Sequence, residues 1–188
     1  MSKEIEVDFG GITNDNCQQL KLINTTCFPI TYAPGFYKDV VQAKNSDLNK
    51  FAYHNGYIIG AICCRVQDVK VLSGDNGDAD AAVSSASGNL DEEEATKKVL
   101  YIMTLAVLPA YRGRGVGKKL LQSVLDHVND ADLKEKEGIQ EVMLHVQVSN
   151  EDGVKFYTDK MGFEKGEKVN DYYTRIDPPH AFILRKKL

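Results

Sequence analysis

The spacing of hydrophobic residues changes between positions 99 and 128. Residues 99–108 are apolar at nearly every position, which predicts a strand covered on both faces, and Pro109 ends it. After Gly115 the apolar positions recur at spacings of three and four, which predicts a helix with one buried face. The members of this face are Val116, Leu120, Leu121, Val124, Leu125 and Val128. The pattern therefore predicts a buried strand joined to an amphipathic helix by a short turn that contains glycine.

A second strand is predicted over residues 142–148. One face carries Val142, Leu144, Val146 and Val148, and the other carries Met143, His145 and Gln147. The strand–helix–strand crossover makes this strand parallel to the one at 99–108. A helix over 150–160, ended by Gly162, and strands near 163–167 and 181–186 follow. The predicted fold class is α/β, with a central mixed sheet flanked by helices.

The first part of the chain predicts two helices separated by an aromatic loop. Thr13 or Asn14 can cap a helix that carries Leu20, Ile23 and Cys27 on one face. Residues 28–37 contain two prolines, a glycine and four aromatic residues, which breaks regular structure. A second short helix is expected from Tyr37 onward, and residues 57–67 are typical of a strand.

Residues 68–98 differ in composition from the rest of the chain. They contain eight acidic and three basic residues, and the stretch 73–89 has almost no large apolar side chain. We expect an acidic flexible insertion in the connection between the strands at 57–67 and 99–108, within a single domain over 1–188. The acidic residues of this insertion could have a functional role, or they could only keep a connecting segment solvated.

Composition excludes several classes of protein. With 43% hydrophobic and 27% charged residues, the 188-residue chain is typical of a folded globular domain. No apolar run reaches the length of a membrane span, and the N-terminus lacks a secretion signal, which predicts a cytoplasmic or nuclear protein without membrane contact. Outside residues 68–98 there are 20 basic and 19 acidic residues, which gives no basic field for nucleic acid. The cysteines at 17, 27, 63 and 64 lack zinc spacing and favour free core thiols, so no metal is expected.

The sequence Arg112-Gly113-Arg114-Gly115-Val116-Gly117 lies between the buried strand and the amphipathic helix. Glycines there allow close backbone approach, and the amides at a helix N-terminus suit phosphate oxygens. A Walker loop would need glycine at position 112, and a dinucleotide fingerprint would need glycine or alanine at position 118. A pyrophosphate cradle and a simple tight turn both remain open on this motif alone.

The glycine loop, with Asn150 and Tyr157 downstream, resembles the acetyl-CoA signature of the GNAT acetyltransferases. Residues 28–32, 100–105, 144–150 and 172–176 resemble the NatE type of catalytic subunit among the N-terminal acetyltransferases of that family. The resemblance covers nearly the whole chain outside 68–98, where a shorter hairpin turn is expected of the family. It implies the GNAT fold, whose mixed sheet contains a splayed parallel strand pair.

The resemblance also implies a reaction and a site. Acetyl moves directly from acetyl-CoA to the α-amine of a peptide that begins with Met, followed by a small or apolar residue such as Leu. Tyr101 and His145 would hold a water that takes the proton, and Tyr157 would protonate the departing thiolate. Cofactor contacts would come from Leu105, Ala106, Val107, Arg112, Gly113, Arg114, Gly115, Val116, Gly117, Asn150 and Tyr157. The peptide cleft would consist of Phe28, Pro29, Ile30, Tyr32, Met103, Tyr172, Tyr173 and Ile176.

Each assignment has a structural alternative. Tyr101 and Tyr157 could be core packing, His145 a hydrogen-bonded core imidazole, and Asn150 a helix cap. The loop at 28–32 could be an aromatic anchor. The competing functions are acetylation of lysine side chains or small amines, and a mainly non-catalytic binding subunit of a ribosomal complex. Expected partners are the peptide or protein N-terminus, with the NatA large auxiliary subunit and the ribosome as further candidates.

Overall fold

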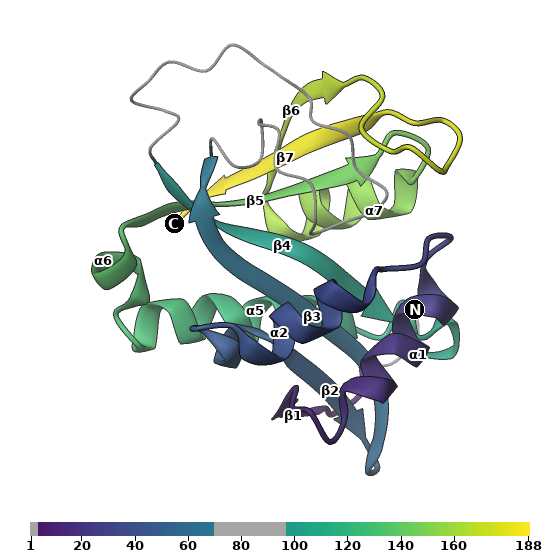
Figure 1. The fold of residues 1–188 in the computed structure, drawn as a ribbon, viewed down its shortest axis with the longest axis vertical. Coiled ribbons are helices and arrows are strands. Elements are labelled where there is room, and N and C mark those ends of the chain that lie inside the picture. The colour runs from purple at the N-terminus through teal and green to yellow at the C-terminus, as the bar shows by residue number, and fades with distance from the viewer. Residues whose placement is uncertain (1–3, 70–96) are drawn as a thin grey trace. The chain divides into compact units, whose positions relative to one another are not determined.

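The computed structural model of the protein describes residues 4–69 and 97–188 (Figure 1). Within these residues, seven strands form one sheet in the order β1-β2-β3-β4-β5-β7-β6. The strands are β1 (Asp8–Gly11), β2 (Lys50–His54), β3 (Tyr57–Asp68), β4 (Lys98–Val107), β5 (Ile139–Gln147), β6 (Glu164–Val169) and β7 (Ala181–Lys187). The helices are α1 (Cys17–Cys27), α2 (Pro34–Gln42), α5 (Val116–Asp130), α6 (Leu133–Glu137) and α7 (Glu151–Lys155), and short turns η1 (Ser46–Leu48), η2 (Pro109–Tyr111) and η3 (Phe156–Lys160) accompany them.

The sheet confirms the predicted mixed topology. β4 and β5 are parallel, whereas the β1–β2, β2–β3, β5–β7 and β6–β7 pairs are antiparallel. Most of the predicted insertion at 68–98 lies outside the described residues, so its role and the single-domain extent over 1–188 stay predictions. Its end residues Asp68 and Lys98 belong to β3 and β4.

The chain divides into two compact units, residues 1–65 with 102–133 and residues 66–101 with 134–188. In the first unit, α1 and α2 cover one face of the sheet, where Leu20, Phe36 and Phe51 belong to the same buried cluster. α5 packs on the sheet at Gly60, where an added Cβ atom would lie 3.3 Å from a Leu120 methyl group. The same Cβ atom would lie 2.7 Å from the Ala106 carbonyl oxygen of β4, so this position has no room for a side chain. The predicted apolar stripe of α5 is buried along its whole length, which confirms that helix.

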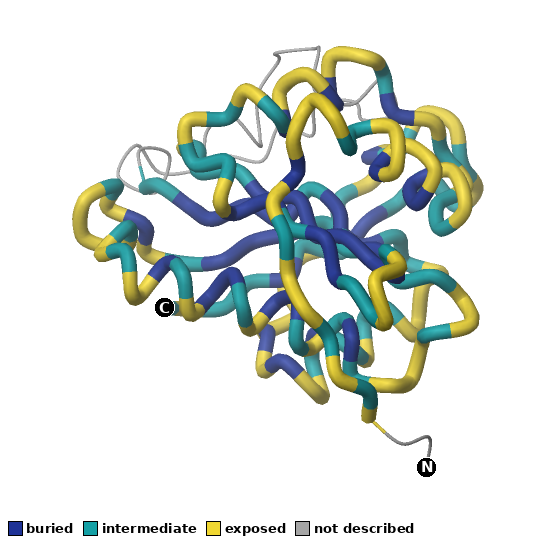
Figure 2. Tube along the Cα trace, turned by 90° about the horizontal axis from the view of Figure 1, so that it is seen from below, coloured by how far each residue is buried: buried dark blue, intermediate teal, exposed yellow. Residues whose placement is uncertain are grey.

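The second unit contains the parallel pairing of β4 with β5 and the antiparallel β7 and β6. β5 is buried on both faces, and its centre pairs with β7 in the register Leu144↔Leu184 and His145↔Ile183. Figure 2 shows that buried residues follow the strands of the sheet. β5 pairs with β4 only as far as Met143 and with β7 from Glu141 to Gln147, so His145 is positioned by its pairing with Ile183 of β7.

Several element boundaries differ from the prediction. The N-cap residue of α1 is Asn16, so neither Thr13 nor Asn14 caps the helix. The Asn16 side-chain oxygen accepts a hydrogen bond from the Thr13 N–H at 2.8 Å. α2 begins at Pro34 because proline suits the first helical turn, three residues before the expected start. The expected helix over 150–160 is α7 followed by a π-helical turn, η3. The strands β1 and β2 had not been predicted.

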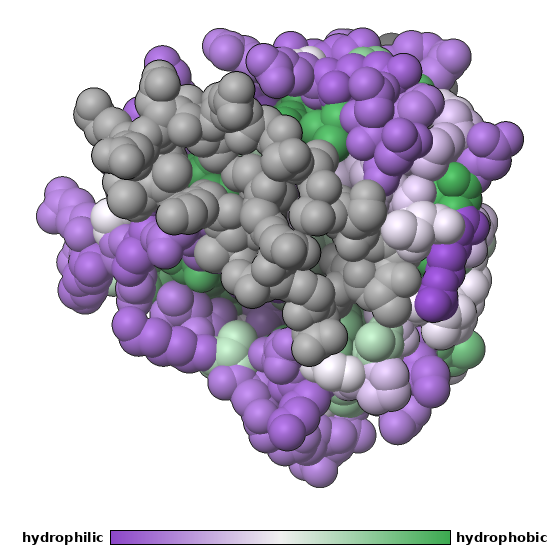
Figure 3. All heavy atoms as spheres, turned by 45° about the horizontal axis from the view of Figure 1, so that its top comes forward, coloured by the Kyte–Doolittle hydropathy of each residue, from purple (hydrophilic) through white to green (hydrophobic). Residues whose placement is uncertain are grey.

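The surface of the described residues is mainly polar. Figure 3 shows mostly hydrophilic residues on the visible part of one face. The exposed large hydrophobic residues are Phe9, Leu22 and Tyr57. Across residues 4–69 and 97–188, no helix has the length and apolar character needed to span a bilayer. All four cysteines are free, and Cys63 and Cys64 are buried, as the composition had predicted.

Candidate active site

The parallel pairing of β4 and β5 covers only the first part of each strand. Its register runs from Lys98↔Ile139 to Tyr101↔Met143. β4 nevertheless extends to Val107 and β5 to Gln147. Tyr101 therefore lies at the last paired position of β4, beyond which the described residues of the two strands share no further register.

The amides of Leu105 and Val107 point away from β3. The N–H of Leu108 donates to the carbonyl oxygen of Ile59 in β3 at 2.9 Å. Successive N–H groups of a strand point to opposite sides, so those of Val107 and Leu105 point to the side opposite β3. This is the side on which hydrogen-bond donors to a thioester or pantetheine group are expected.

The Val107 carbonyl oxygen joins three segments of the first unit. It accepts a hydrogen bond from Arg112 Nε at 2.9 Å and one from the Cys27 thiol at 3.5 Å. Burial raises the pKa of Cys27, while the neighbouring Arg112 opposes that rise, and the thiol stays protonated at neutral pH. The Arg112 side chain therefore fixes the end of β4, a contact that sequence reasoning had not identified.

The glycine loop has the backbone form of an anion cradle. Gly113 and Gly115 have φ angles of 71° and 81°, which side chains other than glycine rarely adopt. α5 begins at Val116, and its 15 residues direct free N–H groups of the first turn toward the loop. A phosphate group fits such a site through backbone amides alone. The loop geometry is consistent with the predicted cradle, and a tight turn would have the same angles.

A chain of hydrogen bonds links three aromatic side chains of the second unit. The Tyr101 hydroxyl lies 3.0 Å from His145 Nδ1 and 3.0 Å from the Tyr172 hydroxyl. The Tyr172 ring stacks on the His145 imidazole, with centroids 4.1 Å apart and an interplanar angle of 12°. Tyr101 comes from β4, His145 from β5 and Tyr172 from the loop that follows β6. The structure thus brings together two predicted catalytic residues and one predicted substrate residue.

The surroundings of His145 keep its imidazole neutral. Burial, and to a lesser degree the charge of Arg185, lower the pKa of His145 to about 3. The Arg185 guanidinium is held by Glu141, whose carboxylate accepts a hydrogen bond from it at 2.8 Å. A neutral imidazole whose Nδ1 accepts the Tyr101 hydroxyl proton carries its own proton on Nε2. Neither Arg185 nor Glu141 had been identified from the sequence, because the register of β5 with β7 determines that the Arg185 charge acts on His145 and that Glu141 can bind Arg185.

Asn150 and Tyr157 also lie in the second unit. The Asn150 side-chain oxygen accepts a hydrogen bond from the Gly153 N–H at 3.0 Å. Asn150 therefore caps α7, which was the structural alternative predicted for it. Tyr157 is buried in η3, with its ring edge-to-face to Phe156 and Phe163. The cofactor and catalytic roles of the two residues stay predictions.

The predicted substrate residues fall in both units. In the first unit, Phe28 and Ile30 pack against the core cluster, Pro29 is exposed, and the Phe28 ring lies edge-to-face to Tyr32 at 5.9 Å. Met103 packs against the same cluster. In the second unit, Tyr172 and Tyr173 are edge-to-face at 4.8 Å, and Ile176 is partly buried. That all eight residues line one cleft stays a prediction.

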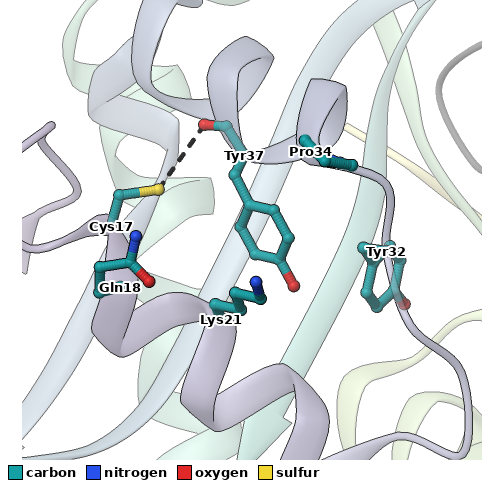
Figure 4. A pocket seen from close by; sticks show the side chains of 6 residues that line it. All are labelled: Cys17, Gln18, Lys21, Tyr32, Pro34 and Tyr37. Atoms are coloured by element: carbon teal, nitrogen blue, oxygen red, sulfur yellow. Dashed lines mark hydrogen bonds between the residues drawn. The ribbon is translucent and has the colours of Figure 1, made fainter.

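A hollow of about 200 Å³ lies between α1 and α2 (Figure 4). It is lined by Cys17, Gln18, Lys21, Tyr32, Pro34 and Tyr37. Tyr32 is the residue that it shares with the predicted substrate set. The Cys17 thiol donates to the Tyr37 carbonyl oxygen at 3.7 Å, which ties the two helices together. In the described part of the chain, no group of His, Cys, Asp and Glu side chains is placed to hold a metal ion.

Comparison with known proteins gives concordant results. Residues 17–163 match the family model described as Acetyltransferase (GNAT) family. Over 183 residues the chain is 37% identical to N-alpha-acetyltransferase 50 of Danio rerio, covering 97% of this chain and 89% of that protein. It is 33% identical to the probable N-acetyltransferase san of Drosophila melanogaster, covering 97% of this chain and 81% of that protein. The solved structure of Arabidopsis thaliana Naa50 in complex with the bisubstrate analogue CoA-Ac-MVNAL matches with a TM-score of 0.72 and 33% identity, over 98% of this chain and 100% of that one.

Proposed function

The chain belongs to the GNAT family of acetyltransferases, and on that premise we propose that it acetylates the α-amine of proteins that begin with Met followed by an apolar residue. Acetyl-CoA is the acetyl donor. The Arabidopsis relative is bound to an analogue that joins CoA to a peptide beginning with Met and Val, which supports this substrate class. The observation that carries the proposal is the hydrogen bond between the Tyr101 hydroxyl and His145 Nδ1, at the end of the parallel strand pairing.

The first chemical task is to remove a proton from the substrate amine. An N-terminal ammonium group has a pKa of about 7.7 to 8.0, so its deprotonation near neutral pH requires only a modest driving force. The Tyr101 hydroxyl and His145 Nδ1, which we expect to hold a water jointly, lie within hydrogen-bond distance of each other at 3.0 Å. The proton can therefore pass from the amine, through a water, to Tyr101 Oη while the proton of Tyr101 moves to His145 Nδ1.

His145 acts in this relay as an acceptor and not as a store of the proton. Its pKa of about 3 means that the imidazolium form gives up its proton at once near neutral pH. The proton then leaves to solvent, and the neutral imidazole is restored for the next cycle. The uncharged imidazole also avoids repulsion with the substrate ammonium group when the peptide binds.

The second task is to position the thioester and release the thiolate. The N–H groups of Leu105 and Val107 would hold the acetyl and pantetheine portion, and the amides of residues 112–117 would bind the pyrophosphate. The amine nitrogen forms a bond to the acetyl carbon, and the carbon–sulfur bond then breaks. Tyr157 would donate a proton to the departing sulfur, and the second proton lost by the nitrogen would pass through water to Tyr157 and restore its hydroxyl. The products are the acetylated N-terminus, CoA thiol and one proton released to water.

Specificity for Met would come from apolar burial. Phe28 and Ile30 present apolar side chains at a loop that packs on the core of the first unit, and Tyr173 offers an aromatic ring in the second. Burial of a Met side chain stabilises a complex by about 1.5 to 3 kcal/mol. Contact with the NatA large auxiliary subunit and the ribosome stays a prediction from the family resemblance, and a cytoplasmic location stays a prediction from the composition of the chain.

A peptide panel tests the proposal. The protein is incubated with acetyl-CoA and one of three peptides: one beginning Met-Leu, one beginning Ser-Glu, and one with a blocked N-terminus and an internal Lys. We expect turnover of the Met-Leu peptide to exceed that of the other two by at least about tenfold, as the loss of apolar burial predicts. Preference for the internal Lys would instead identify a lysine acetyltransferase. Absence of turnover on all three would support the binding-subunit alternative.

A further inference from the structure

Tyr172 contacts both members of the predicted proton relay. Its hydroxyl lies 3.0 Å from the Tyr101 hydroxyl, and its ring is stacked on His145 with a centroid distance of 4.1 Å. Tyr172 is buried, with only 6% of its surface exposed. The family resemblance had placed this residue in the peptide cleft, and nothing in that role requires contact with Tyr101.

The tautomer of His145 sets the direction of the hydrogen bonds. We assign His145 the neutral tautomer with its proton on Nε2, in which Nδ1 is an acceptor and the Tyr101 hydroxyl donates its single proton to it. The Tyr101 oxygen then has only lone pairs left for Tyr172, and the Tyr172 hydroxyl must donate to it. The chain therefore runs from Tyr172 to Tyr101 to His145.

This direction has a chemical consequence for Tyr101. When the Tyr101 proton moves to His145, negative charge builds on the Tyr101 oxygen until it takes up the proton from the substrate side. A hydrogen bond donated to that oxygen is strengthened as the charge builds, which lowers the barrier to the transfer. No covalent bond to Tyr172 forms or breaks, and its proton remains on its own oxygen throughout.

We propose that Tyr172 is a positioning residue of the acetyl transfer reaction, which holds the Tyr101 hydroxyl in line with His145 by donating a hydrogen bond and clamps the imidazole by stacking. The loop after β6 thereby supports the chemistry as well as any peptide contact. The stacked ring fixes the plane of the imidazole, so that Nδ1 stays aimed at the Tyr101 hydroxyl. This inference rests on the proposed function, since the relay serves to deprotonate the substrate amine.

Steady-state kinetics of three variants test this role. Tyr172→Phe keeps the stacked ring and removes only the hydroxyl, so we expect kcat on a Met-Leu peptide to fall about 10- to 100-fold, within the range of acid–base effects. The KM values for acetyl-CoA and peptide should change by less than about threefold. The double variant Tyr101→Phe/Tyr172→Phe should be no slower than Tyr101→Phe alone, because without the Tyr101 hydroxyl there is nothing for Tyr172 to position. Tyr57→Phe, at an exposed surface tyrosine, is the matched control and should retain wild-type kinetics.

A pure peptide-binding role for Tyr172 gives a different pattern. In that case Tyr172→Phe raises the KM for peptide without changing kcat, and its effect multiplies with that of Tyr101→Phe. Either result overturns the proposal.

A measurement without substrate separates this inference from the proposed function. The ¹⁵N chemical shift of His145 Nδ1 reports the hydrogen bond that it accepts, and it should change in Tyr172→Phe but not in Tyr57→Phe. If the wild type fails to acetylate Met-Leu peptides while this shift still responds, the substrate assignment is wrong and the positioning role stands. An unchanged shift together with wild-type kcat would contradict the positioning role itself.

Discussion

The glycine loop at residues 112–117 and the aromatic chain at Tyr101 are built by opposite means. The loop relies on two left-handed glycines and a helix N-terminus, so the groups expected to bind the anion are backbone amides. The aromatic chain relies on three side chains whose hydroxyl and ring atoms meet within about 3 to 4 Å. The difference teaches that removal of single atoms should disable the second region, whereas only changes that alter the backbone or add bulk should disable the first.

The largest effect is expected from loss of the relay groups. Tyr101→Phe removes one oxygen atom, and His145→Ala removes the acceptor, so each should lower kcat on a Met-Leu peptide about 100-fold or more. Stopped assays that count acetylated peptide at saturating acetyl-CoA would measure this, and circular dichroism would confirm that both variants fold. Turnover near the wild-type rate in both variants would remove the aromatic chain from the mechanism.

A substitution in the apolar loop should come next. Phe28→Ala removes an aromatic ring that packs on the core and is predicted to enclose the Met side chain, so kcat/KM for Met-Leu peptides should fall by about 1.5 to 3 kcal/mol. Salt should have little effect, because apolar burial is not screened. The rival source of specificity is the acidic segment at 68–98, which would favour a lysine-rich peptide and lose activity steeply with ionic strength. A steep salt effect together with an unaffected Phe28→Ala variant would support that rival.

The low pKa of His145 predicts a loss of stability in acid. The unfolded chain protonates His145 near pH 6.5 and the folded chain only near pH 3, so the unfolded state binds more protons between these values. The stabilising contribution is complete above pH 6.5 and declines as pH falls, by about 2 kcal/mol between pH 7 and pH 5. Urea unfolding at both pH values would measure it, with His145→Gln as the comparison variant. Equal losses in wild type and variant would show that His145 titrates normally in the folded protein.

A smaller and more selective effect is expected in the glycine loop. Gly115→Val forces a side chain into a left-handed position and toward the Glu4 side chain at 3.3 Å, so the KM for acetyl-CoA should rise about tenfold while kcat changes less. Gly138→Val is a matched control, because Gly138 also has a positive φ and has open space around it. Both variants should lose similar stability, and only Gly115→Val should weaken acetyl-CoA binding. A wild-type KM in Gly115→Val would mean that the loop is only a turn.

The sequence predicted those parts of the fold whose hydrophobic pattern is long and regular. β4, α5 and β5 follow from runs of apolar residues with clear spacing, and their parallel arrangement follows from the crossover. β1 contains two glycines in four residues and lacks any alternation of apolar and polar positions, which explains why it was missed. A short strand of this kind is stabilised by pairing with a neighbouring strand, and the residues of the short strand alone do not indicate that pairing.

The site was predicted only in part for the same reason. Tyr101 and His145 lie on neighbouring strands whose order could be inferred, and that order predicted that the two residues lie close together. Tyr172 reaches them from a loop between β6 and β7, and Arg185 is brought near His145 by the β5–β7 register. Loop paths and strand registers are determined by the packing of the whole unit, so no spacing along the chain indicated either contact.

The pH dependence of kcat/KM on a Met-Leu peptide tests the central claim most directly. A neutral imidazole that relays the proton of an N-terminal amine predicts one inflection on the acid side, at the amine pKa of about 7.7 to 8.0, with no second inflection between pH 5 and 7. An inflection near pH 6.5 would mean that His145 titrates as an ordinary general base, and the account of the neutral relay would be wrong.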